Sequence, residues 1–273
     1  MFYDMLKIAL RSIFGQKLRS ILVSLGVAIG VIAVVGMTAA ALSLQDQLRQ
    51  QLETMGSETF IGMRISPLNF MPGRDRKKWR DLRRRPKLEI SYLKSLKENC
   101  PSCERIAPQA SYGAVIATRG KLKLDNTSAI GVTSDYNGVA EIALGYGRFI
   151  DEYDVEHRRY VCVLGPSVVD ELFKGGNPIG RKIKVKGIPF TVVGVSEPVG
   201  KVLGQDKDNY IAVPITTALH HWWGWWGVQY IIKAKPGMME QAQDEVIATL
   251  RSLRRLKASD ENDFDIFTPD LIM

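Results

Sequence analysis

Residues suited to catalysis and metal binding are scarce in this chain. Its 273 residues include only three histidines and three cysteines, so acid–base chemistry has few candidates and a zinc site few ligands. The nearest approach to a phosphate-cradling Gly-Lys-Ser/Thr loop, Gly175 to Lys182, ends in Gly-Arg-Lys and fails. Gly-x-Ser-x-Gly and His-Glu-x-x-His motifs are absent. We therefore predict no catalytic, cofactor-binding or metal site, and a chain that is not an enzyme.

Charge is missing from one long segment. No Asp, Glu, Lys or Arg lies between Arg19 and Asp46. A helix over residues 21–44 is about 36 Å long, enough to cross a hydrocarbon core of about 30 Å. We predict a transmembrane helix at residues 20–45. A cleaved signal peptide is the alternative, but its apolar region usually has only about 7 to 15 residues, which favours an uncleaved anchor.

The flanks of this segment set its orientation. Lys and Arg outnumber Asp before it, and Asp and Glu follow it, so the N-terminus is expected in the cytoplasm and the large C-terminal part outside. Residues 1–19 predict an amphipathic helix on the inner membrane surface, and residues 46–56 a helical stalk. Within the span, Gly26, Gly30 and Ala33 form a small-residue face that predicts a helix–helix contact.

The positive charge is concentrated rather than spread over a domain. The net charge is +8, and Arg74 to Lys87 hold nine Lys or Arg against two Asp. A patch for phosphate groups and a solvated loop are both open interpretations of this run. Only Trp79 interrupts it, so aromatic platforms for stacking bases are missing and nucleic acid is not expected as a partner.

The remainder alternates between strand and helix patterns and predicts an α+β domain. Strands are expected at residues 60–65, 114–118, 122–124, 128–133, 160–164, 210–213, 229–234 and 264–267. Gly165-Pro166 predicts the start of a helix that ends at Gly175-Gly176. Lys186-Gly187 predicts a hairpin turn, with Lys182, Lys184 and Lys186 on its wet face. Further helices are expected at residues 88–99 and 237–257, and a loop at 145–149.

Two motifs remain open. Cys100 and Cys103 form a C-x-x-C, which suits a local disulfide or two idle thiols better than a redox pair. Trp222, Trp223, Trp225 and Trp226 lie in one Gly-containing stretch. Four exposed tryptophans are costly, so they either fold back onto the domain or meet a partner or lipid. The adjacent His220 and His221 lack further ligands at metal-binding spacing.

The order of these parts resembles the permease family of the macrolide exporter MacB and the lipoprotein-releasing and FtsX-like ABC subunits. The resemblance runs over essentially the whole chain. It is carried by "ALRSIFGQKLRSILVSLGVAIGV" at the start, by "GRFIDEYDVEHRRYVCVLGPSVVDELF", and by "NPIGRKIKVKGIPFTVVGV" and "NYIAVPITTAL". These stretches carry the resemblance in combination.

The resemblance implies an inner-membrane permease with a periplasmic domain of two α+β lobes. Our boundaries are a membrane-proximal lobe at 57–136 plus 206–270 and an inserted lobe at 137–205. It also implies a homodimer, a separate ATPase subunit that binds ATP, and in some members a periplasmic adaptor. Family members continue into three more spans, whereas this sequence ends at Met273, so a fragment or a split gene is expected.

Two other classes stay open. One is a single-span, membrane-anchored periplasmic binding or scaffold protein whose tryptophan stretch contacts a partner or membrane lipid. The other is a membrane-tethered thiol oxidoreductase that uses Cys100 and Cys103. Following spans would decide for the permease, and loss of function in Cys100→Ser would favour the oxidoreductase.

Overall fold

A computed structural model describes residues 21–22, 25–39, 58–66, 80, 82, 84–202, 205–222 and 227–268. The chain divides into two compact units, Met1–Thr54 and Met55–Met273. The amphipathic helix expected at 1–19 and the stalk expected at 46–56 lie outside the described residues.

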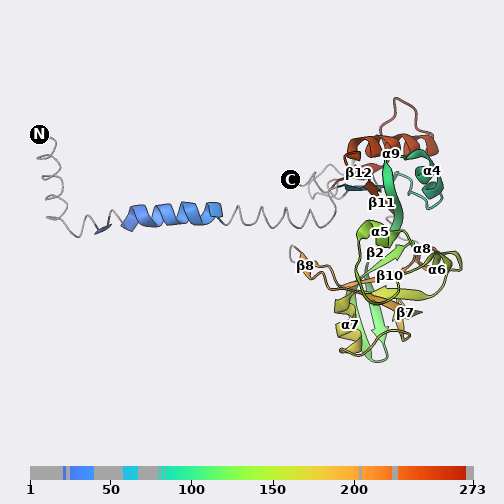
Figure 1. The fold of residues 1–273 in the computed structure, drawn as a ribbon, viewed down its shortest axis with the longest axis horizontal. Helices are drawn as coiled ribbons and strands as arrows, with labels where there is room; N and C mark the ends of the chain where they lie inside the picture. Colours follow the sequence, from blue (N-terminus) through green and yellow to red (C-terminus); the bar gives the residue numbers. More distant parts are fainter. Residues whose placement is uncertain are drawn as a thin grey trace, which may run out of the picture. The chain divides into compact units, whose positions relative to one another are not determined.

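The first unit contains an α-helix at residues 25–39 (Figure 1). Its apolar side chains are solvent-exposed, with Ile32 70% and Ile29 59% accessible. A Cβ added at Gly26 or Gly30 would meet no atom within 4 Å, so the small-residue face has room for a neighbour. Within the described part of the chain, no helix has both the length and the apolar character that a membrane crossing requires.

The second unit is built on one ten-stranded sheet and a separate two-stranded hairpin, β8–β9. The strands of the large sheet are β1 (Thr59–Met63), β2 (Cys103–Arg119), β3 (Leu122–Val132), β4 (Leu144–Gly147), β5 (Val161–Leu164), β6 (Lys182–Val185), β7 (Ile188–Ser196), β10 (Tyr210–Pro214), β11 (Val228–Ala234) and β12 (Asp265–Phe267). The hairpin consists of β8 (Lys201–Val202) and β9 (Gln205–Asp206). The helices are α4 (Tyr92–Asn99), α5 (Tyr136–Ala140), α6 (Glu152–Glu156), α7 (Pro166–Phe173), α8 (Ile215–His221) and α9 (Met239–Leu253).

The first half of β2 belongs to a four-stranded part of the sheet, in the order β12-β1-β11-β2. Helices α4 and α9 contact each other and lie at this end of the unit (Figure 1). Their apolar sides pack with alternate strand residues, because a strand directs every second side chain to one face. The resulting core contains Phe60, Leu96, Ile106, Tyr230, Ile232, Val246 and Leu250.

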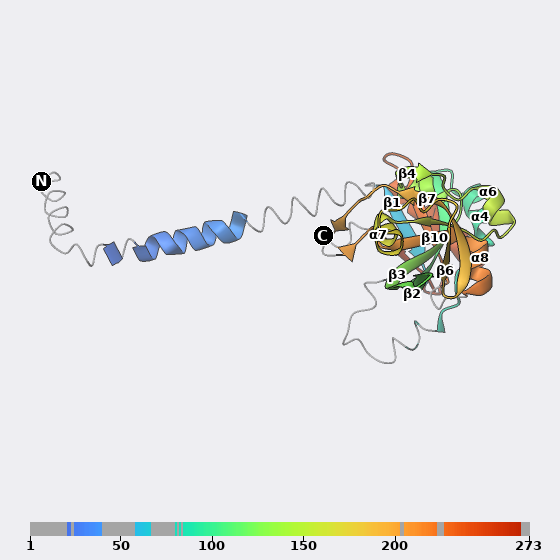
Figure 2. The same cartoon turned by 90° about the horizontal axis from the view of Figure 1, so that it is seen from below.

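The second half of β2 helps to close a ring of strands. The order β2-β3-β10-β5-β7 continues through β6, which pairs with both β7 and β2. The six strands share one core, which includes Val115, Ala129, Cys162, Leu164, Ile183, Phe190, Val192, Ile211 and Val213. Helices α7 and α8 add side chains to this core and lie to either side of β10 (Figure 2). Ring closure gives β6 two partners instead of an exposed edge.

Strands of the ring are apolar on their other face too. Val163 and Ala212 pack there with Ala107, Val132 and Val139 in a third core beside α5. Successive residues of β5 and β10 therefore point into different cores and both are buried, which explains why residues 161–164 read as a continuous apolar run.

The α+β class and the main strands and helices agree with the sequence expectations, with four differences. Two separate expected strands join as β3, and the expected loop at 145–149 overlaps edge strand β4. Helix α4 begins at Tyr92 rather than at 88, and α5 and α8 were not expected. The lobe boundaries remain a prediction.

Candidate functional site

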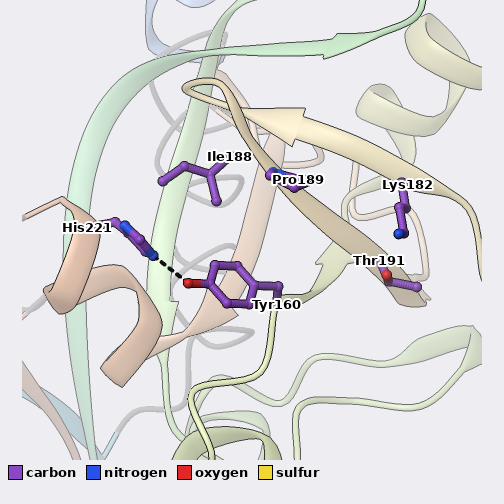
Figure 3. A pocket seen from close by; sticks show the side chains of 6 residues that line it. All are labelled: Tyr160, Lys182, Ile188, Pro189, Thr191 and His221. Carbon is purple, nitrogen blue, oxygen red and sulfur yellow. Dashed lines mark hydrogen bonds between the residues drawn. The ribbon is translucent and has the colours of Figure 1, made fainter.

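A pocket of about 410 Å³ lies on the ring of strands, where β5, β6, β7 and the end of α8 meet (Figure 3). Polar side chains and apolar side chains share its wall. Its lining consists of Tyr160, Lys182, Ile188, Pro189, Thr191 and His221. No acidic residue belongs to this lining, so the charge at the pocket comes from a lysine.

Tyr160 and His221 form one wall. The Tyr160 hydroxyl and the His221 Nε2 atom lie 2.8 Å apart and share one hydrogen bond, drawn as the dashed line in Figure 3. The two rings are 5.6 Å apart between centroids. Tyr160 also packs 5.8 Å from Phe190 of the ring core. The pair therefore joins the start of β5 to the end of α8 across 61 residues of sequence.

Strand register places the opposite wall. Lys182 of β6 is the cross-strand partner of Thr191 in β7, and Lys184 is the partner of Pro189. Directly opposed residues point to the same face of a sheet, so Lys182 and Thr191 lie on one face, as Figure 3 shows. Ile183, between Lys182 and Lys184 in β6, and Phe190, between Pro189 and Thr191 in β7, point into the core instead.

A buried ion cluster holds the segment that leads into Tyr160. The Asp154 side chain is fully buried, and its carboxylate lies 2.5 Å from Arg148 and 3.2 Å from Arg159. Burial opposes the charged carboxylate, but the Arg148 hydrogen bond and the nearby arginine charges outweigh it, so the pKa of Asp154 is lowered. The carboxylate stays charged and fastens α6.

Helix α8 is fastened to the same segment. The Thr216 hydroxyl donates to the Val155 carbonyl, and the Thr217 hydroxyl donates to the Arg159 carbonyl at 3.1 Å. Side-chain donors that satisfy buried carbonyls hold neighbouring segments in one geometry. The position of His221 relative to Tyr160 therefore follows from α6, α8 and the Asp154 cluster together.

Trp222, the first residue of the tryptophan stretch, folds back onto the domain. It is 7% exposed, and its ring lies 5.5 Å from Phe190 and 5.7 Å from Tyr112. Burial removes Trp222 from the residues predicted to contact a partner or lipid, because its ring surface is already covered. Trp223, Trp225 and Trp226 lie outside the described residues.

Cys100 and Cys103 are joined by a disulfide, with Cα atoms 5.3 Å apart. The bond connects the end of α4 to the start of β2, and a neighbouring hydrogen bond runs from the Ser102 hydroxyl to Glu245 of α9. The third cysteine, Cys162, is completely buried, and burial raises the pKa of its thiol. A protonated, enclosed thiol is unreactive.

The described end of the basic run has a structural role. Arg85 contacts Asp265 of β12 at 2.8 Å and donates to the Arg64 carbonyl at 3.1 Å. The rest of the run from Arg74 is mostly outside the described residues. Among the residues that the structure describes, no three His, Cys, Asp or Glu side chains gather in a way that would hold a metal ion.

Sequence reasoning found some pocket residues and missed others. It placed Lys182 on the wet face of a hairpin and noticed His221, but it did not single out Tyr160 or Thr191 as site residues. These side chains meet only through strand pairing and the packing of α8. No local pattern marks them, since their separation in sequence exceeds any turn or helix repeat.

Comparison with known proteins identifies relatives that match most of this chain. A family model described as the MacB-like periplasmic core domain matches residues 20–249. The macrolide export ATP-binding/permease protein MacB of Chlorobium phaeobacteroides is 26% identical over 262 residues, or 93% of this chain and 38% of that protein. The MacB protein of Bdellovibrio bacteriovorus is 28% identical over 264 residues, or 94% of this chain and 39% of that protein. The chain thus spans about two fifths of these curated relatives.

Solved structures show the same fold. The periplasmic region of MacB from Actinobacillus actinomycetemcomitans has a TM-score of 0.63 at 22% identity, covering 82% of this chain and 95% of that chain. The extracellular domain of the noncanonic ABC-type transporter YknZ has a TM-score of 0.57 at 14% identity, covering 77% and 100%. Because the family match includes the helix at 25–39 and nearly all of the second unit, the chain belongs to the MacB-like periplasmic core domain family.

Proposed function

We propose that this chain is the N-terminal portion of the permease subunit of a MacB-like ABC transporter. The observation that carries the proposal is the continuous family match over residues 20–249, which takes in the apolar helical segment together with the folded domain. The relatives are named as macrolide export ATP-binding/permease proteins. The corresponding role for this chain is to couple ATP hydrolysis by a separate subunit to export or to lipoprotein and other cell-envelope processes.

The role proposed for this chain is conformational rather than chemical. A separate ABC ATPase subunit binds and hydrolyses ATP in the cytoplasm, and the chain itself needs no cofactor. ATP binding favours one of two arrangements of the permease, and the periplasmic domain follows because it continues from the span. A periplasmic adaptor and a second copy of the chain are further proposed partners.

The proposed topology is a single span in the bacterial inner membrane at residues 20–45, with the N-terminus in the cytoplasm. Support comes from the exposed apolar side chains at residues 25–39, which need an apolar surrounding. The open face at Gly26 and Gly30, continued by Ala33, is the proposed dimer contact in the span. The lobes at 57–136 plus 206–270 and at 137–205 complete the proposed domain.

Co-purification with the ATPase tests the proposal. The chain is expressed with the cognate ATPase in two forms, as given and extended through the coding sequence that adjoins it, each with an affinity tag. We expect the extended form to retain the ATPase and the chain alone to lose it, because in the resembling family the element that touches the ATPase belongs to the later spans.

Failure of both forms to retain the ATPase would contradict the transporter proposal. A membrane-anchored binding or scaffold protein would then be the better interpretation. The pocket on the ring of strands favours it, because a pocket can bind a ligand without an ATPase. Membrane fractionation of both forms serves as the control, since a form that is not in the membrane does not test the contact.

A further inference from the structure

We propose that the pocket lined by Tyr160, Lys182 and Thr191 binds the oxyanion of a small amphipathic ligand, such as a phosphate carried on an apolar group. The site lies where β5, β6, β7 and the end of α8 meet (Figure 3). The proposal does not depend on transport, because binding is a property of this domain alone.

Unpaired positive charge is the first argument. Lys182, Lys184 and Lys186 occupy alternate positions along β6 and the turn that follows, and each is exposed. Within the described residues, none of the three makes an ion pair with a carboxylate, and the pocket lining contains no acid. A ligand anion at Lys182 would therefore meet an attractive field without displacing a protein partner.

Convergent hydrogen-bond donors are the second argument. Lys182 and Thr191 are cross-strand partners, so their Cβ atoms lie about 5 Å apart and both heads reach one bound anion. The ammonium group offers three donors and the hydroxyl one. The Tyr160 hydroxyl is held by His221 at 2.8 Å, which fixes the adjacent wall.

Apolar surface beside these donors is the third argument. Ile188, Pro189 and the Tyr160 ring line the remainder of the pocket. A volume of about 410 Å³ falls within the range of about 300 to 1,000 Å³ for small-molecule sites. The space fits one ring or a short alkyl group next to the anion. A free inorganic ion would leave the apolar side chains of the pocket exposed to water, so we expect a ligand that has an apolar group.

The test measures binding of phenyl phosphate to the full chain in a neutral detergent by saturation-transfer NMR, with 31P line width as a second readout. We expect saturable binding, with inorganic phosphate weaker and phenol weaker still. Competition by benzoate tests whether a carboxylate serves equally. Phosphatidate mixed into the micelles, as a competitor, distinguishes a lipid headgroup from a soluble ligand.

Matched variants locate the site. Lys182→Met is expected to weaken binding by about tenfold, the usual effect of losing a charged hydrogen-bond donor. The isosteric Thr191→Val is expected to weaken it by about three- to fivefold, the size of one neutral hydrogen bond. Lys184→Met removes the same charge one exposed position along β6, outside the lining, and is expected to change binding by less than about twofold.

Two results would overturn the proposal. One is the absence of saturable phenyl phosphate binding at millimolar concentrations. The other is equal weakening by Lys182→Met and Lys184→Met, which would reduce the effect to the general positive charge of β6. Unchanged circular dichroism of the variants, whose altered side chains lie at the surface, excludes misfolding as the cause.

Discussion

At the scale of single residues, Asp154 is the side chain on which the site geometry most depends. Its carboxylate is fully buried between Arg148 and Arg159, and it also accepts a hydrogen bond from the Asp151 backbone. Both arginine side chains remain partly exposed. If the contact with Asp154 were lost, water could therefore form hydrogen bonds to them in its place. The buried carboxylate has no such substitute.

We predict that Asp154→Asn lowers the free energy of unfolding by about 1 to 3 kcal/mol, because the amide has no negative charge and loses the second acceptor oxygen, which receives hydrogen bonds from Arg148 and the Asp151 backbone. The folded-state pKa of Asp154 lies below its ordinary value of 3.8. The stability from this charge is therefore fully present well above that value and is lost as the pH falls through the folded pKa. The difference in Tm between the original chain and the variant should shrink as the pH is lowered from 7 to about 3.

Asp151→Asn is the matched control for this prediction. It removes a charge from the same helix, but Asp151 is half-exposed and caps α6, and asparagine caps equally well. A loss of less than about 0.5 kcal/mol is expected. Equal losses in both variants would show that the effect comes from negative charge at the start of α6 in general and not from the buried carboxylate of Asp154.

At the scale of elements, α8 links the pocket to the sheet. Gly131 of β3 faces it so closely that an added Cβ would lie 2.8 Å from the Ala218 Cβ and 3.2 Å from the Ile215 Cα. Real Cβ atoms do not approach that closely, so glycine is what allows α8 to lie against β3. The helix in turn carries His221 and Trp222.

We predict that Gly131→Ala displaces α8 and lowers stability by about 1 to 3 kcal/mol through overpacking. The readout is tryptophan fluorescence, in which the contribution of buried Trp222, one of five tryptophans, should shift to longer wavelength as water reaches the ring. Gly145→Ala is the control, because its Cβ would meet atoms only at 3.7 Å or more. A Gly131→Ala protein as stable as the control would contradict this account of the contact.

Elements also show how far sequence reasoning extends. The helix after Gly165-Pro166 and the hairpin at Lys186-Gly187 were predicted correctly, because caps, turns and alternation are local signals. Ring closure between β2 and β6 was not predictable, since it pairs Ala117 with Val185 far along the chain. Helix α8 was missed because seven residues are too few to show a periodic pattern. The pocket was missed as well, because it brings together strand residues and His221 of α8, which lie far apart in the sequence.

At the scale of the whole second unit, strand β2 joins two cores. Its 17 residues carry Ile106 into the core under α4 and α9 and Val115 into the core of the ring. The ten strands form one hydrogen-bonded sheet. Melting either core would therefore remove the support of a strand that the other core needs.

We predict that the second unit unfolds in one cooperative transition for this reason. Leu250→Ala in the first core and Leu172→Ala in the ring core each remove a fully buried side chain, at a cost of about 2 to 5 kcal/mol. Both variants should lower the same Tm, by roughly 5 to 15 °C for a unit of this size. Thermal circular dichroism and tryptophan fluorescence of the full chain in detergent would follow the transition with two probes.

Val199→Ala is the control for this prediction, since Val199 is 73% exposed and its truncation should leave Tm within about 1 °C. Two separate transitions, each lowered by only one of the leucine variants, would show that the cores fold independently and that β2 tolerates melting at one end. A single transition instead means that the two cores depend on each other for stability through β2. In the proposed permease, that is the property the periplasmic domain needs in order to follow movement of the span as one body.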